Sequence, residues 1–207
     1  MILYEYEAKR LCREQGISAP QGEVIRTPKE AEETVRKIGK PAVLKPQVLD
    51  SGWRKGDIHL ADTPEEGARV AEGILKRPAD GQSVVEVLVE ERLDIQKELY
   101  VGVKVDGAAG SPLVMASFEE LSDFDEAAQL PKRVAYQHAD VFGGLQPYQA
   151  RKIAKGLGFS GDEAVKLADQ IYRLYRVFAK WNALVADFSP LIMTQGQNFI
   201  AAGGFLE

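Results

Sequence analysis

Hydrophobic positions follow helical spacing at the start of the chain and again near its C-terminal end. In residues 3–15 the apolar side chains recur near one face, and Gly16 suits the end of a helix. From Ser160 the residues Ser-Gly-Asp-Glu form a capping box, and the apolar residues that follow keep helical spacing: Ala164, Ala168, Ile171, Tyr175 and Phe178. These patterns predict an N-terminal helix and a long helix that begins at Ser160.

Between residues 20 and 100 the pattern alternates between helix and strand. Thr27 and Thr63 are each followed by proline and then by glutamate three residues on, which indicates helix N-caps with proline in the first turn. Helices are therefore expected at 27–39 and 63–75, and short apolar runs predict strands at 41–46, 57–61 and 83–91. This alternation predicts a compact α/β subdomain over residues 20–100.

The second half of the chain has a different pattern. Two apolar runs within residues 97–120 flank Asp-Gly-Ala-Ala-Gly, which is typical of a hairpin turn. Residues 183–204 predict two or three short strands with a Gln-Gly turn. The chain as a whole is therefore expected to be α+β.

Composition excludes several classes of partner. The net charge is −5, and no basic run is interleaved with aromatic residues, so a nucleic-acid partner is not expected. No window approaches the apolar length of a membrane span, so no membrane partner is expected either. The single cysteine, Cys12, cannot form an internal disulfide and fits a reducing cytoplasm.

Common catalytic motifs are missing from the sequence. It contains no Walker lysine motif, no Gly-x-Gly-x-x-Gly after a strand and no zinc-ligand spacing. His59 falls on a predicted strand and His138 in a connecting stretch, and structural or surface roles are expected for both.

Charged residues at strand ends carry the remaining chemistry. Lys45 ends an apolar run, where it can contact a phosphate or lie at a sheet edge with its head in water. Glu90 and Glu98 can accept hydrogen bonds from a ribose or an amino group, or be solvated strand ends. Asp187 interrupts an apolar strand, and burying it is costly unless it has a partner or a cation.

Several collinear strings resemble one protein family. They include LYEYEAKRLCREQGISAP, TPKEAEETVRKIGKPAVLKPQV, VLVEERLDIQKELYVGVKVD, LVMASFEE, PYQARKIAKGLG and ALVADFSPLIMT. With these strings the chain resembles the N-terminal, ATP-grasp half of the β subunit of succinyl-CoA synthetase (succinate–CoA ligase, ADP- or GDP-forming). The resemblance implies an ATP-grasp fold over residues 1–207, made of two α/β subdomains with a nucleotide cleft between them. The smaller would be 20–100, and the second would join 1–19 to 101–207.

The resemblance also assigns nucleotide-binding residues. It implies that Lys45 contacts the nucleotide phosphates and that the loop carrying Gly52, Trp53 and Arg54 covers them. Glu90 would lie at the adenine–ribose end, Leu93 near the base through its backbone, and Glu98 would hold the ribose or the neighbouring strand. The loop has fewer glycines than the family's, which makes backbone approach to a phosphate harder.

The implied metal site departs from the family pattern. Asp187 stands where the family has glutamate, and Ser189 where it has asparagine as a magnesium ligand. Ala202 aligns with the family's second metal acid and supplies no carboxylate. Magnesium commonly binds one or two carboxylates beside the phosphates, so weak magnesium binding is expected.

Two functions are compatible with this pattern. The first is the ATP- or ADP-binding component of an acid–CoA ligase, of the kind that serves the tricarboxylic acid cycle. Because the family's C-terminal CoA-ligase domain has no counterpart in these residues, the chain would need that domain or a CoA-binding α-type partner that bears the phosphohistidine, and would not be active alone. The second is a degenerate ATP-grasp domain that acts as a scaffold or regulatory subunit.

Overall fold

The computed structural model describes residues 1–49, 58–79, 82–118 and 134–207 of the chain. The chain divides into two compact units. The smaller unit is Pro20–Leu93, and the larger joins Met1–Ala19 to Asp94–Glu207. The sequence-predicted boundary at residue 100 falls inside a strand of the larger unit, Ile95–Asp106.

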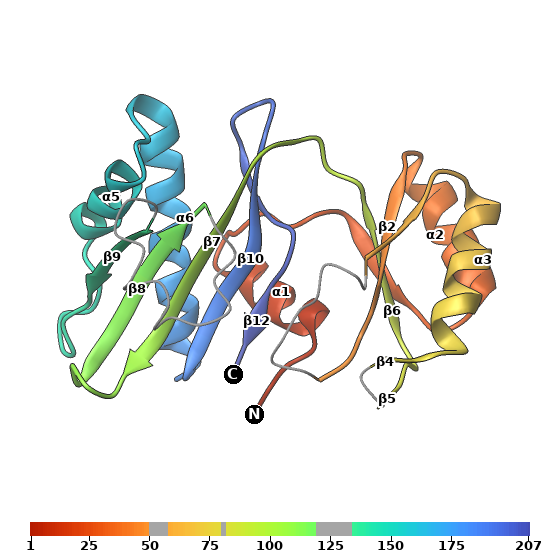
Figure 1. Ribbon diagram of the computed structural model, residues 1–207, viewed down its shortest axis with the longest axis horizontal. Coiled ribbons are helices and arrows are strands. Elements are labelled where there is room, and N and C mark those ends of the chain that lie inside the picture. Colours follow the sequence, from red (N-terminus) through yellow and green to blue (C-terminus); the bar gives the residue numbers. More distant parts are fainter. Residues whose placement is uncertain (50–57, 80–81, 119–133) are drawn as a thin grey trace. The chain divides into compact units, whose positions relative to one another are not determined.

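In the smaller unit, helices cover one face of an antiparallel sheet with the strand order β1-β6-β2-β3 (Figure 1). The helices are α2 (Pro28–Ile38) and α3 (Pro64–Leu75). The sheet strands are β1 (Gly22–Ile25), β2 (Ala42–Pro46), β3 (His59–Ala61) and β6 (Val87–Glu91). A separate pair consists of β4 (Pro78–Ala79) and β5 (Gln82–Ser83).

The faces of this sheet follow the alternation of its side chains. Ala42 and Leu44 of β2 pack into the helix-facing core with Val87 and Val89 of β6. Since successive side chains on a strand point to opposite faces, Lys45 of β2 and Glu90 of β6 lie on the face turned away from the helices. The register, with Lys45 opposite Leu88 and Val43 opposite Glu90, makes Lys45 and Glu90 diagonal neighbours.

In the larger unit, helices pack on one face of a sheet with the order β11-β10-β7-β8-β9, and β12 pairs with β10 (Figure 1). The helices are α1 (Glu5–Glu14), α5 (Pro147–Gly156) and α6 (Gly161–Lys180). The strands are β7 (Ile95–Asp106), β8 (Ser111–Ser117), β9 (Val134–His138), β10 (Val185–Thr194), β11 (Phe199–Ala201) and β12 (Phe205–Leu206).

Helix N-caps account for the predicted starts of α2 and α3. The Thr27 hydroxyl accepts from the Glu30 backbone N–H at 3.3 Å, and the Thr63 hydroxyl accepts from the Glu66 N–H at 3.2 Å. The predicted capping box at Ser160 is wrong in one respect: within the described residues, the Ser160 side chain makes no capping hydrogen bond. The helix still begins there, because α6 buries an apolar stripe that includes Ala164, Ala168, Ile171 and Phe178.

The strand predictions need three corrections. The strand expected at 83–91 is confined to β6, and residues 82–83 pair separately. His138 is not in a connecting stretch but ends β9, because Leu113 of β8 pairs with it. Residues 183–204 contain two strands, β10 and β11, as expected, but β10 is 10 residues long rather than short, and its register with β7 shifts between Phe188 and Leu191. None of the helices in the described part of the chain is long and apolar enough to span a membrane.

Candidate functional site

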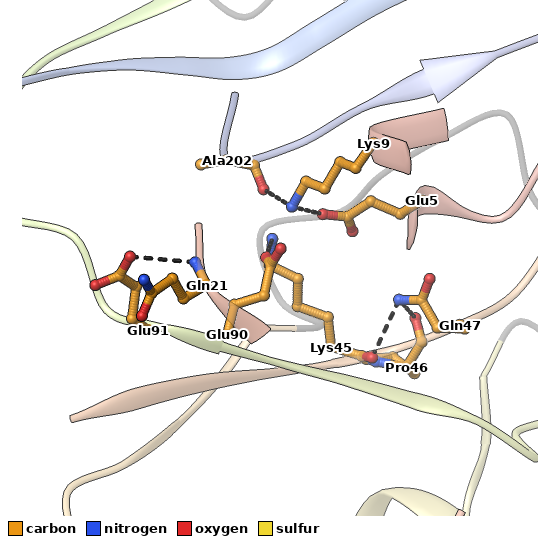
Figure 2. Close-up of polar contacts among 9 residues, drawn as sticks. All are labelled: Glu5, Lys9, Gln21, Lys45, Pro46, Gln47, Glu90, Glu91 and Ala202. Atoms are coloured by element: carbon orange, nitrogen blue, oxygen red, sulfur yellow. Dashed lines mark hydrogen bonds and ion pairs between the residues drawn. The ribbon is translucent and has the colours of Figure 1, made fainter. Parts of the chain in front are cut away.

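A buried ion pair lies on the face of the smaller sheet that is turned away from its helices. The Lys45 ammonium lies 3.0 Å from Oε2 of Glu90, and the two side chains are 5% and 1% exposed. Figure 2 shows the two side chains pointing toward one another. The interpretation of Lys45 as an edge lysine is wrong, because β2 lies between β6 and β3. Glu90 is likewise not a solvated strand end.

Gln47 belongs to the same buried neighbourhood and was missed in the sequence analysis. The residue is 3% exposed, and its side-chain amide donates to the backbone carbonyls of Lys45 and Pro46 at 3.3 and 3.4 Å (Figure 2). Its backbone N–H donates to the Glu86 carbonyl at 2.9 Å. The only signal in the sequence is its position two residues after Lys45, which would place both side chains on one face of an extended strand.

Glu91 differs from its neighbour Glu90. Its carboxylate accepts from the Gln21 backbone N–H at 3.1 Å and from Lys40 at 2.8 Å. The hydrogen bond from Lys40 is the main cause of a lowered Glu91 pKa. Since the Lys40 side chain is largely exposed, Glu91 has a surface role at the end of β6.

The other predicted nucleotide-binding residues lie in different parts of the chain. Leu93 is half-buried where the smaller unit ends, next to Arg92, whose N–H donates to the Pro41 carbonyl at 2.8 Å. Glu98 is exposed on β7 of the larger unit, opposite Ile192. Gly52, Trp53 and Arg54 lie outside the described residues.

The predicted metal residue Asp187 lies on β10, opposite Gly102 of β7. Asp187 as a whole residue is partly exposed, but protein atoms surround its carboxyl, and this desolvation raises the pKa of Asp187 to about 7. A hydrogen bond from the Tyr100 hydroxyl acts against that rise. Asp187 therefore has a partner, as the cost of burying an isolated acid requires.

Ser189 and Ala202 lie beside each other at the irregular part of β10. The backbone N–H groups of Ala202 and Gly203 both donate to the Pro190 carbonyl, each at 3.1 Å. A Cβ on Gly203 would lie 2.6 Å from the Ser189 carbonyl carbon, so the two backbones are in close contact. Ser189, a predicted metal ligand, thus lies next to Ala202, where the resemblance places an acid that this chain lacks.

A buried lysine of α1 holds this corner of the larger unit. The Lys9 ammonium donates to the Ala202 carbonyl at 2.6 Å and pairs with Glu5 at 2.6 Å, as Figure 2 shows. Both side chains are almost fully buried. Within the residues that the structure describes, no three His, Cys, Asp or Glu side chains are grouped so that they could hold a metal ion.

The chain matches the ATP-grasp domain family over residues 2–193 and belongs to that family. The ATP-grasp fold is a nucleotide-binding fold, and the resemblance drawn from the sequence is confirmed.

Among curated proteins, the chain is similar to β subunits of succinate–CoA ligases. It is 38% identical over 209 residues to the ADP-forming subunit β of Methanothermobacter thermautotrophicus, which covers 100% of this chain and 57% of that protein. It is 37% identical over 204 residues to the GDP-forming subunit β of Thermus thermophilus, which covers 98% of this chain and 54% of that protein. The chain thus spans about half the length of these relatives.

Solved structures share the fold at low sequence identity. A dinucleotide-forming acetyl-coenzyme A synthetase of Ca. Korarchaeum cryptofilum, in complex with coenzyme A and Ca-AMPCP, superposes with a TM-score of 0.79 at 21% identity, covering 99% of this chain and 92% of that one. An ATP citrate lyase from Methanothrix soehngenii has a TM-score of 0.72 at 17% identity, covering 99% and 50%. At these identities the likeness shows the fold alone.

Proposed function

We propose that this chain is the nucleotide-binding ATP-grasp part of a cytoplasmic acid–CoA ligase that resembles succinyl-CoA synthetase. The overall reaction would convert ATP, an acid and CoA into acyl-CoA, ADP and phosphate. The observation that carries the proposal is the buried Lys45–Glu90 pair on the face of the small sheet turned away from its helices. A buried ion pair contributes little net stability compared with apolar residues, so a role in binding would account for a lysine at this buried position.

In this proposal Lys45 supplies a point charge to the nucleotide phosphates, and Glu90 orients its ammonium. Asp187 and Ser189 would hold a magnesium ion, which would neutralise phosphate charge during transfer. One carboxylate and one hydroxyl fit an ion that keeps most of its water and phosphate ligands. The Asp187 carboxylate accepts a hydrogen bond from Tyr100 and still has further lone pairs that could bind a cation.

The remaining steps belong to a partner in this proposal. Phosphate would pass to a histidine on a CoA-binding α-type subunit, or on a further domain, and then to the acid. The CoA thiol would attack the acyl phosphate and release phosphate. The length of the curated relatives supports this division, since the chain accounts for 57% of one of them. Copurification of such a partner from the native cell would test the assignment.

Calorimetric titration with ADP tests the nucleotide site. Lys45→Ala is expected to weaken ADP binding by about tenfold or more, because a hydrogen bond to a charged group contributes about 1.5–3 kcal/mol. Lys40→Ala is the matched control, because Lys40 lies on the same unit but pairs with Glu91 at the surface. Equal affinities for the Lys45 variant and the unmodified chain would contradict the proposal.

A degenerate domain that acts as a scaffold or regulatory subunit is the second candidate. The observation that favours it is the shortage of metal ligands: Ala202 carries no oxygen in its side chain, and its carbonyl accepts from Lys9. Repeating the titration with ATP, with and without magnesium, separates the two functions. Tighter binding with magnesium supports the ligase, and equal or absent binding supports the degenerate domain.

A further inference from the structure

Tyr100 lies on the face of the larger sheet that is turned away from α5 and α6. Its neighbours Leu99 and Val101 point into the helix-facing core, so alternation directs Tyr100 to the other face. There it packs with Met115 of β8 and is 5% exposed.

Gly102 leaves the space that the tyrosine ring occupies. A Cβ on Gly102 would lie 2.8 Å from Cζ of Tyr100 and would overlap its hydroxyl. The ring therefore lies along its own strand, above the next residue of the same face. Gly102 is also the register partner of Asp187 on β10, so the absence of its side chain opens the path from Tyr100 to Asp187.

The Tyr100 hydroxyl uses this path to hydrogen-bond to the Asp187 carboxyl. A tyrosine hydroxyl is protonated at neutral pH, so it is the donor in this hydrogen bond. Tyr100 is buried, so the bond holds the Asp187 carboxyl from the protein side.

The packing alone does not require a tyrosine. The apolar neighbours Met115, Leu113 and Val134 would accommodate a phenylalanine ring equally well. Compared with phenylalanine, the tyrosine adds only the hydroxyl, and this hydroxyl is hydrogen-bonded to the Asp187 carboxyl.

We propose that Tyr100 is a positioning residue that, through the space left by Gly102, orients the Asp187 carboxylate toward the divalent cation that accompanies the nucleotide. The inference rests on the proposed function, in which Asp187 is the metal carboxylate. It adds to that site a residue that would not itself touch the metal or the nucleotide.

The test compares Tyr100→Phe with Asp187→Asn, using ADP and Mg²⁺ as probes. Calorimetric ADP titrations at a series of magnesium concentrations give the magnesium concentration at which the gain in ADP affinity reaches half of its maximum. Tyr100→Phe is expected to raise that concentration by about tenfold, as is common for groups that orient metal ligands. ADP affinity without magnesium should stay unchanged, which a general loss of structure would not produce.

Further variants sharpen the comparison. Tyr136→Phe removes a tyrosine hydroxyl from an exposed position on β9 and should change nothing. Gly102→Ala should reproduce the effect of Tyr100→Phe although the hydroxyl is retained, because the ring is displaced. The double variant Tyr100→Phe/Asp187→Asn should be no worse than Asp187→Asn. In the EPR spectrum of Mn²⁺ bound with ADP, Tyr100→Phe should reduce the bound fraction at a fixed metal concentration.

The outcomes separate the inference from the function on which it rests. If Asp187→Asn raises the magnesium requirement and Tyr100→Phe does not, the positioning role is wrong and the metal assignment stands. If Asp187→Asn has no effect, or if the unmodified chain binds no ADP at any magnesium concentration, the proposed metal role and this inference both fall.

Discussion

At the scale of single residues, two adjacent glutamates of β6 offer a direct comparison. Glu90 and its partner Lys45 are 1% and 5% exposed, whereas Glu91 and its partner Lys40 are 16% and 62% exposed. Glu90→Gln leaves a buried ammonium without its counter-charge, so we expect a loss of about 3–5 kcal/mol in the free energy of unfolding. Glu91→Gln should cost less than about 1 kcal/mol, because water and salt screen the exposed pair.

Urea unfolding of both variants checks this prediction, with the transition midpoint read at constant slope. The double substitution Lys45→Met/Glu90→Leu should recover most of the stability while removing ADP binding, because apolar residues of similar size often replace a buried ion pair at no cost. Equal losses for Glu90→Gln and Glu91→Gln would show that the Lys45–Glu90 pair is more hydrated than its burial indicates.

At the scale of elements, the sequence predicted what depends on local signals. The caps of α2 and α3 lie within a few residues of the helices they begin, so Thr27 and Thr63 could be read directly. The partners of Lys45 and Asp187 could not, because strand pairing joins residues distant in sequence: Glu90 lies 45 residues from Lys45. Once a strand is known, alternation gives the face on which each residue lies, but it does not give the strand that lies beside it.

The corner where β10 meets the segment before β12 shows the same limit, and it yields a prediction. Gly203 is buried there, and a Cβ would lie 2.6 Å from the Ser189 carbonyl carbon. Gly203→Ala should lower the free energy of unfolding by about 1–3 kcal/mol, as overpacking does. Gly107→Ala is the control in the same unit, because a Cβ there meets nothing within 4 Å, and it should stay within about 0.5 kcal/mol.

Chemical denaturation followed by tryptophan fluorescence and circular dichroism measures both glycine variants. Gly203→Ala should also weaken the magnesium dependence of nucleotide binding, because Ser189 lies against the displaced backbone. A Gly203→Ala protein as stable as Gly107→Ala would mean that the corner relaxes without cost, and that Ser189 is not held by it.

At the scale of the whole molecule, the histidines decide whether these 207 residues could complete the proposed reaction. The chain has two histidines, His59 and His138. His59 is exposed at the start of β3. His138 is held at the end of β9, where its Nε2 lies 2.9 Å from the Asp106 carboxylate and its backbone carbonyl accepts from Gln149. A phosphate that approached this Nε2 would meet the negative charge of the Asp106 carboxylate, which repels it.

We therefore expect a protein made of these residues to yield no thioester when mixed with ATP, CoA and a panel of dicarboxylates. Under the same conditions it should bind ADP, and Lys45→Ala should weaken that binding. Loss of folding then cannot explain the absence of thioester. A complete succinate–CoA ligase serves as the positive control, and adding a copurified partner chain should restore acyl-CoA formation. If the 207-residue protein alone forms acyl-CoA, and His59→Asn/His138→Asn abolishes it, the chain carries its own phosphoryl acceptor and the division of labour proposed here is wrong.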